Sequence, residues 1–255
     1  MQVMSAVIVI PARYDSTRFP GKPIALLRGK PLIQHVYENA KGAASAEDVI
    51  VATDSETIFE RVLSFGGKAV MTSRNHASGT DRIAEVVPSL GCDIIVNVQA
   101  DEPMIQPAMI DDAIGLLSDE GADIGTLVKE IRDPEEVTDP NVVKAAFGRD
   151  GFALYFSRAP IPYHRDIWKD LDRFEIQRSR FRVFKHIGIY SYKRDVLLEL
   201  AGMKPSRLEE IEKLEQLRAL ENGFRIKVKE TSSETIGVDT PQDLERVERW
   251  LSLSS

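Results

Sequence analysis

The sequence has 255 residues, of which 43% are hydrophobic and 29% are charged, so the chain is long enough to bury a sizeable core. Its 33 basic and 40 acidic residues give a net charge of −7, which argues against general binding to nucleic acids or anionic membranes. The single cysteine, Cys92, excludes an intrachain disulfide and a cysteine-based zinc site. No apolar run approaches the roughly 20 residues that span a bilayer, and the run at residues 6–10 is too short for a signal peptide. We therefore expect a soluble, globular, cytoplasmic protein.

The first half of the chain alternates segments typical of strands with segments typical of helices. Strands are expected at residues 6–10, 48–52, 69–71 and 94–98, and helices at residues 31–40, 55–65, 80–90 and 107–117. Strands that are apolar on both faces and alternate with helices indicate a parallel sheet that is covered on both sides. A ligand site would then lie beyond the carboxyl ends of the strands.

The pattern changes after Asp139. Two apolar segments, residues 142–147 and 152–156, are joined by the turn GRDG and predict a β-hairpin. Residues 168–182 are highly charged and are expected to form a surface excursion. Further strands are expected at residues 185–192 and 225–229, and helices at residues 207–222 and 241–251.

A cationic loop, residues 11–23 (PARYDSTRFPGKP), lies between the first expected strand and the first expected helix. It carries Arg13, Arg18 and Lys22 and only one acidic residue. Amide donors, guanidinium groups and a lysine are what a polyphosphate requires of such a loop. Neither the Walker A pattern nor the G-x-G-x-x-G fingerprint is present, so neither of these common nucleotide loops explains it. By themselves, the same residues fit a solvated basic loop equally well.

Acidic residues mark two further segments. Asp101 and Glu102 follow an expected strand and could present oxygen ligands to Mg²⁺, although an acidic pair before proline is also an ordinary turn. The segment GVDTP, residues 237–241, reads most simply as the N-cap and first turn of the last helix. The charged residues 207–222 read as a solvated helix face, and the four histidines show no spacing typical of metal ligands.

Eight segments of unusual composition occur in order from near residue 5 to near residue 248. They are PARYDSTRFPGKP (11–23), VATD (51–54), MTS with HASGTDR (71–73 and 76–82), NVQADEP (97–103), LYFSRAPIP (154–162), KHIGIY (185–190), EKLEQLRALE (212–221) and GVDTP (237–241). Taken together, these segments resemble the 3-deoxy-manno-octulosonate cytidylyltransferase family, the CMP-Kdo synthetases. The resemblance covers almost the whole chain.

The resemblance implies Mg²⁺-dependent transfer of CMP from CTP to the anomeric hydroxyl of 3-deoxy-manno-octulosonate (Kdo), with release of pyrophosphate. The product would be the activated sugar for lipopolysaccharide assembly in Gram-negative bacteria. The fold implied is a nucleotide-diphospho-sugar transferase-like α/β domain over residues 1–255, with a mainly parallel sheet and helices on both faces. Residues 139–192 would form a smaller, β-rich sub-domain that folds out and mediates a homodimer. Neither a nucleic acid nor a membrane is implied as a partner.

The resemblance also assigns roles to individual residues. Arg13 and Lys22 would hold the triphosphate and stabilise charge on the transferred phosphoryl group and on pyrophosphate. Asp101 and Asp239 would bind the catalytic magnesium. The residues that would face the cytosine and ribose are Arg74, Ser78, Gly79 and Gln99. The residues that would line the sugar-acid pocket are Arg158, His186, Tyr190, Glu215 and Gln216.

The chain departs from the family pattern at Ala100, where the family usually has glycine. A methyl group there would matter if the backbone needed a positive φ or a close approach to the nucleotide. Three alternatives stay open: the 8-amino analogue of Kdo as substrate, another sugar acid such as sialic acid, and a catalytically silent nucleotide-binding relative. Retention of Lys22, Asp101 and Asp239 argues against the silent relative, which has no need of a complete metal and phosphate set.

Overall fold

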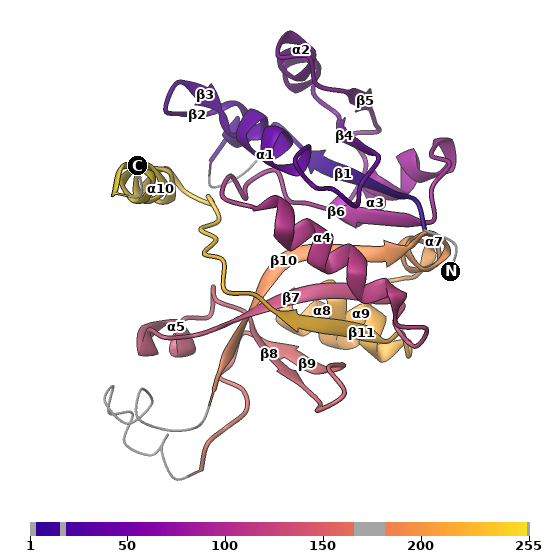
Figure 1. Cartoon of the computed structure of the whole chain (residues 1–255), viewed down its shortest axis with the longest axis vertical. Helices are drawn as coiled ribbons and strands as arrows, with labels where there is room; N and C mark the ends of the chain where they lie inside the picture. The colour runs from indigo at the N-terminus through magenta and orange to yellow at the C-terminus, as the bar shows by residue number, and fades with distance from the viewer. Residues whose placement is uncertain (1–3, 16–18, 166–181, 254–255) are drawn as a thin grey trace.

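The structure, a computed structural model, describes residues 4–15, 19–165 and 182–253 (Figure 1). The strands of the main sheet are β1 (Ala6–Ala12), β4 (Asp48–Thr53), β5 (Ala69–Met71), β6 (Ile94–Asn97), β7 (Ile124–Glu130), β8 (Lys144–Phe147), β9 (Ala153–Ser157), β10 (Phe184–Lys193) and β11 (Ile226–Glu230). A separate hairpin comprises β2 (Leu26–Leu27) and β3 (Lys30–Pro31). In the part of the chain described, seven strands of the main sheet follow the order β11-β7-β10-β6-β1-β4-β5, and β8 and β9 extend the sheet from β10.

Helices connect most of these strands. The α-helices are α1 (Leu32–Ala40), α2 (Glu56–Ser64), α3 (Gly79–Val86), α4 (Pro107–Gly115), α5 (Pro134–Thr138), α7 (Arg194–Gly202), α8 (Arg207–Glu212), α9 (Gln216–Glu221) and α10 (Pro241–Leu253). Short 3₁₀ turns are η1 (Lys22–Ile24), η2 (Val87–Ser89) and η3 (Leu116–Ser118). The helices and strands expected in the first half of the chain are all present.

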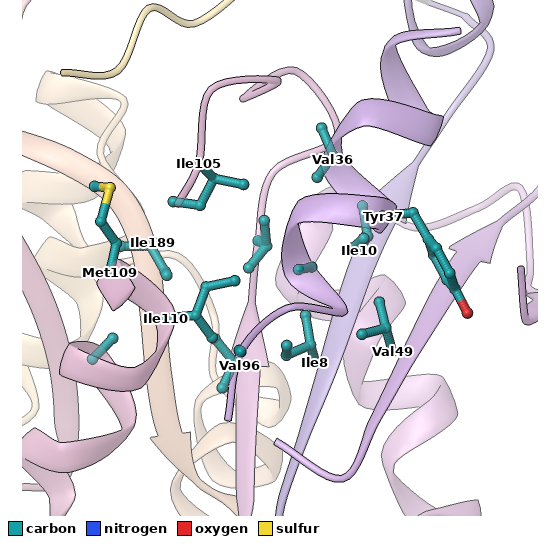
Figure 2. Close-up of a cluster of buried hydrophobic side chains, with 14 of the residues drawn as sticks. Ile8, Ile10, Val36, Tyr37, Val49, Val96, Ile105, Met109, Ile110 and Ile189 are labelled. Atoms are coloured by element: carbon teal, nitrogen blue, oxygen red, sulfur yellow. The ribbon is translucent and has the colours of Figure 1, made fainter. Parts of the chain in front are cut away.

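Helices cover both faces of the sheet, which explains the continuous apolar runs in its strands. Figure 2 shows Ile110 of α4 beside Val96 of the sheet, and Val36 of α1 and Ile8 of β1 belong to the same fully buried cluster. On the opposite face, α3, α7 and α9 bury a second cluster that includes Ile95. Full burial of one such side chain contributes about 1.5–3 kcal/mol, so both faces stabilise the sheet.

The sheet contains both parallel and antiparallel strand pairs. The directions of its strands determine which strand ends meet at one edge of the sheet. β1 pairs in parallel with β4 and β6, so the carboxyl ends of these strands lie at one edge of the sheet. β10 runs antiparallel between β6 and β7, with Tyr190 opposite Asn97 at the carboxyl end of β6. The first half of β10 therefore reaches the same edge, although it is far away in the sequence.

Helix α10 returns the end of the chain to this edge. After β11 the chain crosses in an extended segment to α10 (Figure 1). Val238 and Val247 join Leu27, Leu32 and Met104 in a separate apolar cluster. This packing brings the segment before α10 next to the loop that follows β6.

The second half of the chain corrects several expectations. The sequence did not predict β7 or α7, and β10 makes the sheet less uniformly parallel than expected. The single helix expected at residues 207–222 is instead two helices, because Lys213 adopts a left-handed conformation with φ of 55° and ends α8. The hairpin is confirmed as antiparallel β8 and β9. Almost all of the charged segment 168–182 lies outside the described residues, and a separate role for residues 139–192 stays a prediction.

Candidate active site

The cationic loop after β1 is shaped by a glycine. The N–H of Gly21 donates to the carbonyl of Tyr14 at 2.9 Å, which closes the loop. Gly21 has a φ of 70°, and a Cβ there would lie 3.3 Å from the Tyr14 ring, so a larger residue would be strained. Lys22 follows at the start of η1. Arg18 lies outside the described residues.

The Lys22 ammonium lies between the two acids that the resemblance assigns to magnesium. Its Nζ is 2.5 Å from Oδ2 of Asp101 and 3.1 Å from Oδ1 of Asp239. Burial alone would lower the pKa of Lys22, but the two carboxylates outweigh it and raise that pKa, so the side chain is a cation at neutral pH. Carboxylates from opposite ends of the chain therefore converge on one positive charge.

A backbone contact explains how Asp239 reaches Asp101. The N–H of Val238 donates to the carbonyl of Asp101 at 2.9 Å. The helix cap that the sequence predicts in GVDTP is confirmed at Thr240, whose hydroxyl accepts from the N–H of Asp243 at 3.3 Å. The Asp243 carboxylate in turn accepts from the N–H of Thr240 at 2.9 Å. The cap and the Asp239 carboxylate thus perform separate tasks.

Glu102 adds a third carboxyl group beside this pair. Burial, together with the nearby charges of Asp101 and Asp239, raises the pKa of Glu102 to about 8. Its Oε2 is buried without a hydrogen-bond partner among the described residues. A Cβ on Gly237 would lie 3.3 Å from Oε1 of Glu102, so glycine leaves room for this side chain.

The described residues contain no group of three or more His, Cys, Asp or Glu side chains arranged to hold a metal ion alone. Mg²⁺ in nucleotide sites usually takes one or two carboxylates and completes its shell with substrate phosphates and water. The oxygens of Asp101 and Asp239 meet that requirement, since both already contact one cation. The donor set therefore fits a magnesium ion that is bound together with a triphosphate.

A cavity of about 270 Å³ contains most of the residues assigned to the nucleotide. Its lining includes Arg13, Lys22, Ser78, Gly79, Gln99, Asp101 and Asp239. Helix α3 begins here, with Ser78 as the N-cap of a capping box. A Cβ on Gly79 would lie 3.2 Å from Cγ of Pro11, so glycine lets α3 begin close to β1. The positive end of α3 therefore faces the cavity that holds the cationic loop.

Arg82 also lines this cavity, although the sequence reasoning did not single it out. Its side chain is only 4% exposed and donates to Asp54 at 2.7 Å and to Thr72 at 2.5 Å. These contacts join α3 to the segments after β4 and β5. The sequence offered only an indirect indication of this role. The segments that resemble the family include Asp54, Thr72 and Arg82.

A larger cleft, about 990 Å³, adjoins the first cavity through shared residues. Asp101 and Asp239 line both, and the larger cleft also contains Glu102, Lys185 and His186. Burial lowers the pKa of His186 to about 3, so its ring is neutral at physiological pH. The acid pair therefore lies where the two spaces meet.

The other residues assigned to the sugar lie elsewhere. Tyr190, Glu215 and Gln216 line a small cavity of about 20 Å³ beside α3. The Glu215 carboxylate accepts from the hydroxyls of Ser78 at 2.9 Å and Thr80 at 3.0 Å. Burial raises the pKa of Glu215, and these hydrogen bonds oppose that rise. Glu215 thus contacts the helix of the nucleotide cavity directly.

Arg158 and Arg74 line none of these three cavities among the described residues. The Arg158 guanidinium donates to the carbonyls of Glu212 and Pro140, each at 2.8 Å. Ala100 is buried and does not have a positive φ, a conformation that only Arg28 and Lys213 adopt among the described non-glycine residues. The methyl group of Ala100 therefore causes no backbone strain of the kind that its departure from the family pattern suggested.

No helix in the described part of the chain is both long enough and apolar enough to cross a lipid bilayer.

Comparison with known proteins assigns the chain to a family. The model of the cytidylyltransferase family matches residues 7–231. The 3-deoxy-manno-octulosonate cytidylyltransferase of Geobacter sulfurreducens is 54% identical over 245 residues, which cover 96% of this chain and 98% of the relative. The enzyme of the same name from Thermodesulfovibrio yellowstonii is 51% identical over 260 residues, which cover 99% of this chain and all of the relative.

Solved structures agree with this assignment. A CMP:2-keto-3-deoxy-manno-octonic acid synthetase complexed with CTP superposes with a TM-score of 0.89 at 43% identity, covering 98% of this chain and 100% of that one. A 4-diphosphocytidyl-2C-methyl-D-erythritol synthase from Anaerococcus prevotii, at 10% identity and a TM-score of 0.63, shares the fold alone, over 98% of this chain and 100% of its own. The chain belongs to the cytidylyltransferase family, and within it to the 3-deoxy-manno-octulosonate cytidylyltransferases.

Proposed function

We propose that this chain transfers CMP from CTP to the anomeric hydroxyl of Kdo and releases pyrophosphate, as the names of its relatives indicate for them. The observation that carries the proposal is the position of Lys22 between Asp101 and Asp239, at the junction of two cavities. One cavity is lined by cations and by the start of α3, which suits a nucleoside triphosphate. The other is large enough for a sugar acid.

Asp101 and Asp239 would hold the magnesium ion, and Glu102 lies beside them with a buried oxygen that no described residue hydrogen-bonds. The ion, when bound, would neutralise phosphate charge and make the attacking hydroxyl more acidic. The two aspartates come from loops that are tied together by the hydrogen bond from Val238 to Asp101, so their spacing is preorganised.

Lys22 and Arg13 would act on the triphosphate. Lys22 is a largely buried cation that would exchange its carboxylate partners for phosphate oxygens when CTP and the ion bind. Its charge then stabilises the negative charge that develops on the leaving pyrophosphate. Arg13 is exposed at the rim of the cavity, where a guanidinium can bind phosphate oxygens.

The sugar acid would occupy the larger cleft beside His186. In that position its anomeric hydroxyl would lie near Asp101 and Asp239, which line the cleft, and would attack the phosphoryl group from the side opposite pyrophosphate. Tyr190, Glu215 and Gln216 would act at the end of the sugar nearest α3. Arg158 supports the adjacent backbone through Glu212 and Pro140.

We also propose a homodimer and a cytoplasmic location. Among the described strands, β9 pairs only with β8, and its Leu154 is 68% exposed. Ile211 of the nearby α8 is 66% exposed, so this side of the molecule offers apolar surface to a second copy. The cytoplasmic location follows from the use of CTP, an intracellular nucleotide.

Pyrophosphate release from CTP and Mg²⁺ tests the proposal, with Kdo, its 8-amino analogue and sialic acid as parallel acceptors. We expect Kdo to give the highest kcat/KM. Release with no acceptor would contradict the proposal, and a preference for either of the other two acceptors would overturn the assignment of Kdo.

A further inference from the structure

A β-bulge in β10 lies against the sugar cleft. The pairing of β10 with β7 shifts between Ile187 and Tyr190, so Gly188 and Ile189 are extra residues in β10. The bulge turns two carbonyl oxygens towards the side chain of Thr126 in β7. Oγ1 of Thr126 lies 2.7 Å from the carbonyl oxygen of Ile189 and 3.4 Å from that of Ile187.

The third neighbour of the Thr126 hydroxyl is the ring of His186, whose Nε2 lies 2.8 Å from Oγ1. A carbonyl oxygen can only accept a hydrogen bond, and a hydroxyl has one proton to donate. The Thr126 proton therefore goes to Ile189, and Oγ1 presents a lone pair to Nε2. An attractive contact at this distance requires that Nε2 carries the ring proton.

The other ring nitrogen then has no proton. Burial lowers the pKa of His186 to about 3, so the neutral ring carries a single proton at physiological pH. No described residue makes a hydrogen bond to Nδ1. The ring centroids of Phe156 and Tyr190 each lie 5.1 Å from that of His186, which fixes the plane of the ring. His186 also lines the cleft that Asp101 and Asp239 share.

We propose that Thr126 is a positioning residue that holds His186 as the Nε2–H tautomer, so that Nδ1 accepts a hydrogen bond from a hydroxyl of the sugar acid. The inference deepens the proposed function and depends on its placement of the sugar in this cleft. Thr126 is fully buried and is not among the described residues that line the three cavities above, so it acts through His186.

The tautomer can be measured without substrate. The chain has only four histidines, so a long-range ¹⁵N–¹H spectrum of protein labelled at histidine would resolve each ring, and the His186→Asn variant identifies the signals of His186. We expect the Nε2–H form in the parent and in Thr126→Ser, and a mixture or the Nδ1–H form in the isosteric Thr126→Val. An Nδ1–H ring in the parent, or an unchanged ring in Thr126→Val, would overturn the proposal.

Kinetics then test the role in sugar binding. Thr126→Val should raise the KM for Kdo roughly tenfold and leave the KM for CTP unchanged, because one buried hydrogen bond is misdirected. Thr126→Ser should restore the parent value. An equal rise in both KM values would mean that Thr126 supports only the fold. A confirmed tautomer with an unchanged KM for Kdo would overturn the role of Nδ1 as an acceptor, while pyrophosphate release would still report on the proposed reaction.

Discussion

Lys22 occupies the space between Asp101 and Asp239, and this arrangement makes the acid pair testable. Each carboxylate lies within 3.1 Å of the ammonium nitrogen, so neither can be lost without changing the charge at the junction of the two cavities. Removal of a metal-binding carboxylate takes away a contact that matters most in the transition state.

Asp101→Asn and Asp239→Asn should therefore fold normally but lose activity on the order of a thousandfold, since a lost metal contact costs several kcal/mol of transition-state stabilisation. Steady-state pyrophosphate release at saturating Mg²⁺ and circular dichroism are the measurements. The control is Asp48→Asn, which removes only a surface pair with Lys68, whose side chain is 64% exposed. Turnover like that of the parent in either site variant would refute the metal assignment.

The buried His186 gives a pH dependence whose sign is fixed. The folded pKa of His186, about 3, is below the ordinary histidine pKa of 6.5, so the unfolded chain binds one more proton between these values. The free energy of unfolding therefore falls as the pH falls through this window. Between about pH 7 and about pH 5, His186→Asn should lose less stability than the parent, by on the order of 1 kcal/mol in urea titrations. An identical loss in both proteins would mean that His186 is charged in the folded state.

The short connection between the helices α8 and α9 places Glu215 beside α3. The sequence predicts one solvated helix here, but the left-handed Lys213 ends α8, and Glu215 lies at the N-cap of α9. Glu215 accepts hydrogen bonds from Ser78, the N-cap of α3, and from Thr80. Helix α9 is therefore attached to the helix that begins at the nucleotide cavity.

Glu215→Ala should weaken both the fold and the binding of CTP. Two hydroxyls would lose their acceptor in a partly buried site, which costs about 1 kcal/mol in urea unfolding. Calorimetric titration should show weaker CTP binding, because Ser78 lines the nucleotide cavity. Glu210→Ala, at an exposed position of α8, is the control. CTP affinity and stability equal to those of the parent would show that α9 and α3 are not coupled.

The helices and strands in the first half of the chain are predictable because the apolar runs and the positions of proline and glycine indicate the same ends for each element. Strand β7 was not predicted, because its apolar pattern is interrupted by Gly125, Thr126 and Lys129. Gly125 is needed there: a Cβ would lie 2.7 Å from the carbonyl oxygen of Ala113. Helix α7 was not predicted, because it follows β10 directly and has no side-chain cap at Lys193 to mark its start.

The site was harder to predict from the sequence than the fold was. Pattern alone indicated the cationic loop and Asp101, whereas the pairing of Asp101 with Asp239 came only from resemblance. The reason is physical, since a backbone hydrogen bond from Val238 and an apolar cluster under α10 create that pairing, and neither has a sequence signature. The same holds for Thr126, whose contacts depend on a bulge in a strand far along the chain.

The exposed apolar surface beside β9 leads us to expect that two copies of the chain form a dimer. Sedimentation equilibrium of the parent should give twice the chain mass of 28.5 kDa, and Leu154→Asp should shift the protein towards the monomer. Leu63→Asp is the matched control, because Leu63 is 50% exposed on α2, away from β9. A parent that is monomeric at all concentrations, or a dimer that survives Leu154→Asp, would contradict the assignment of this surface.

The proposed reaction requires that the junction of the two cavities holds a divalent cation and the triphosphate together. A crystal structure of the chain with CTP and Mn²⁺, phased on the manganese anomalous signal, tests this most directly. We expect manganese bound to carboxylate oxygens of both Asp101 and Asp239, with the Lys22 ammonium moved from these acids onto phosphate oxygens. Manganese that contacts neither aspartate, or a triphosphate that lies away from Lys22, would contradict it.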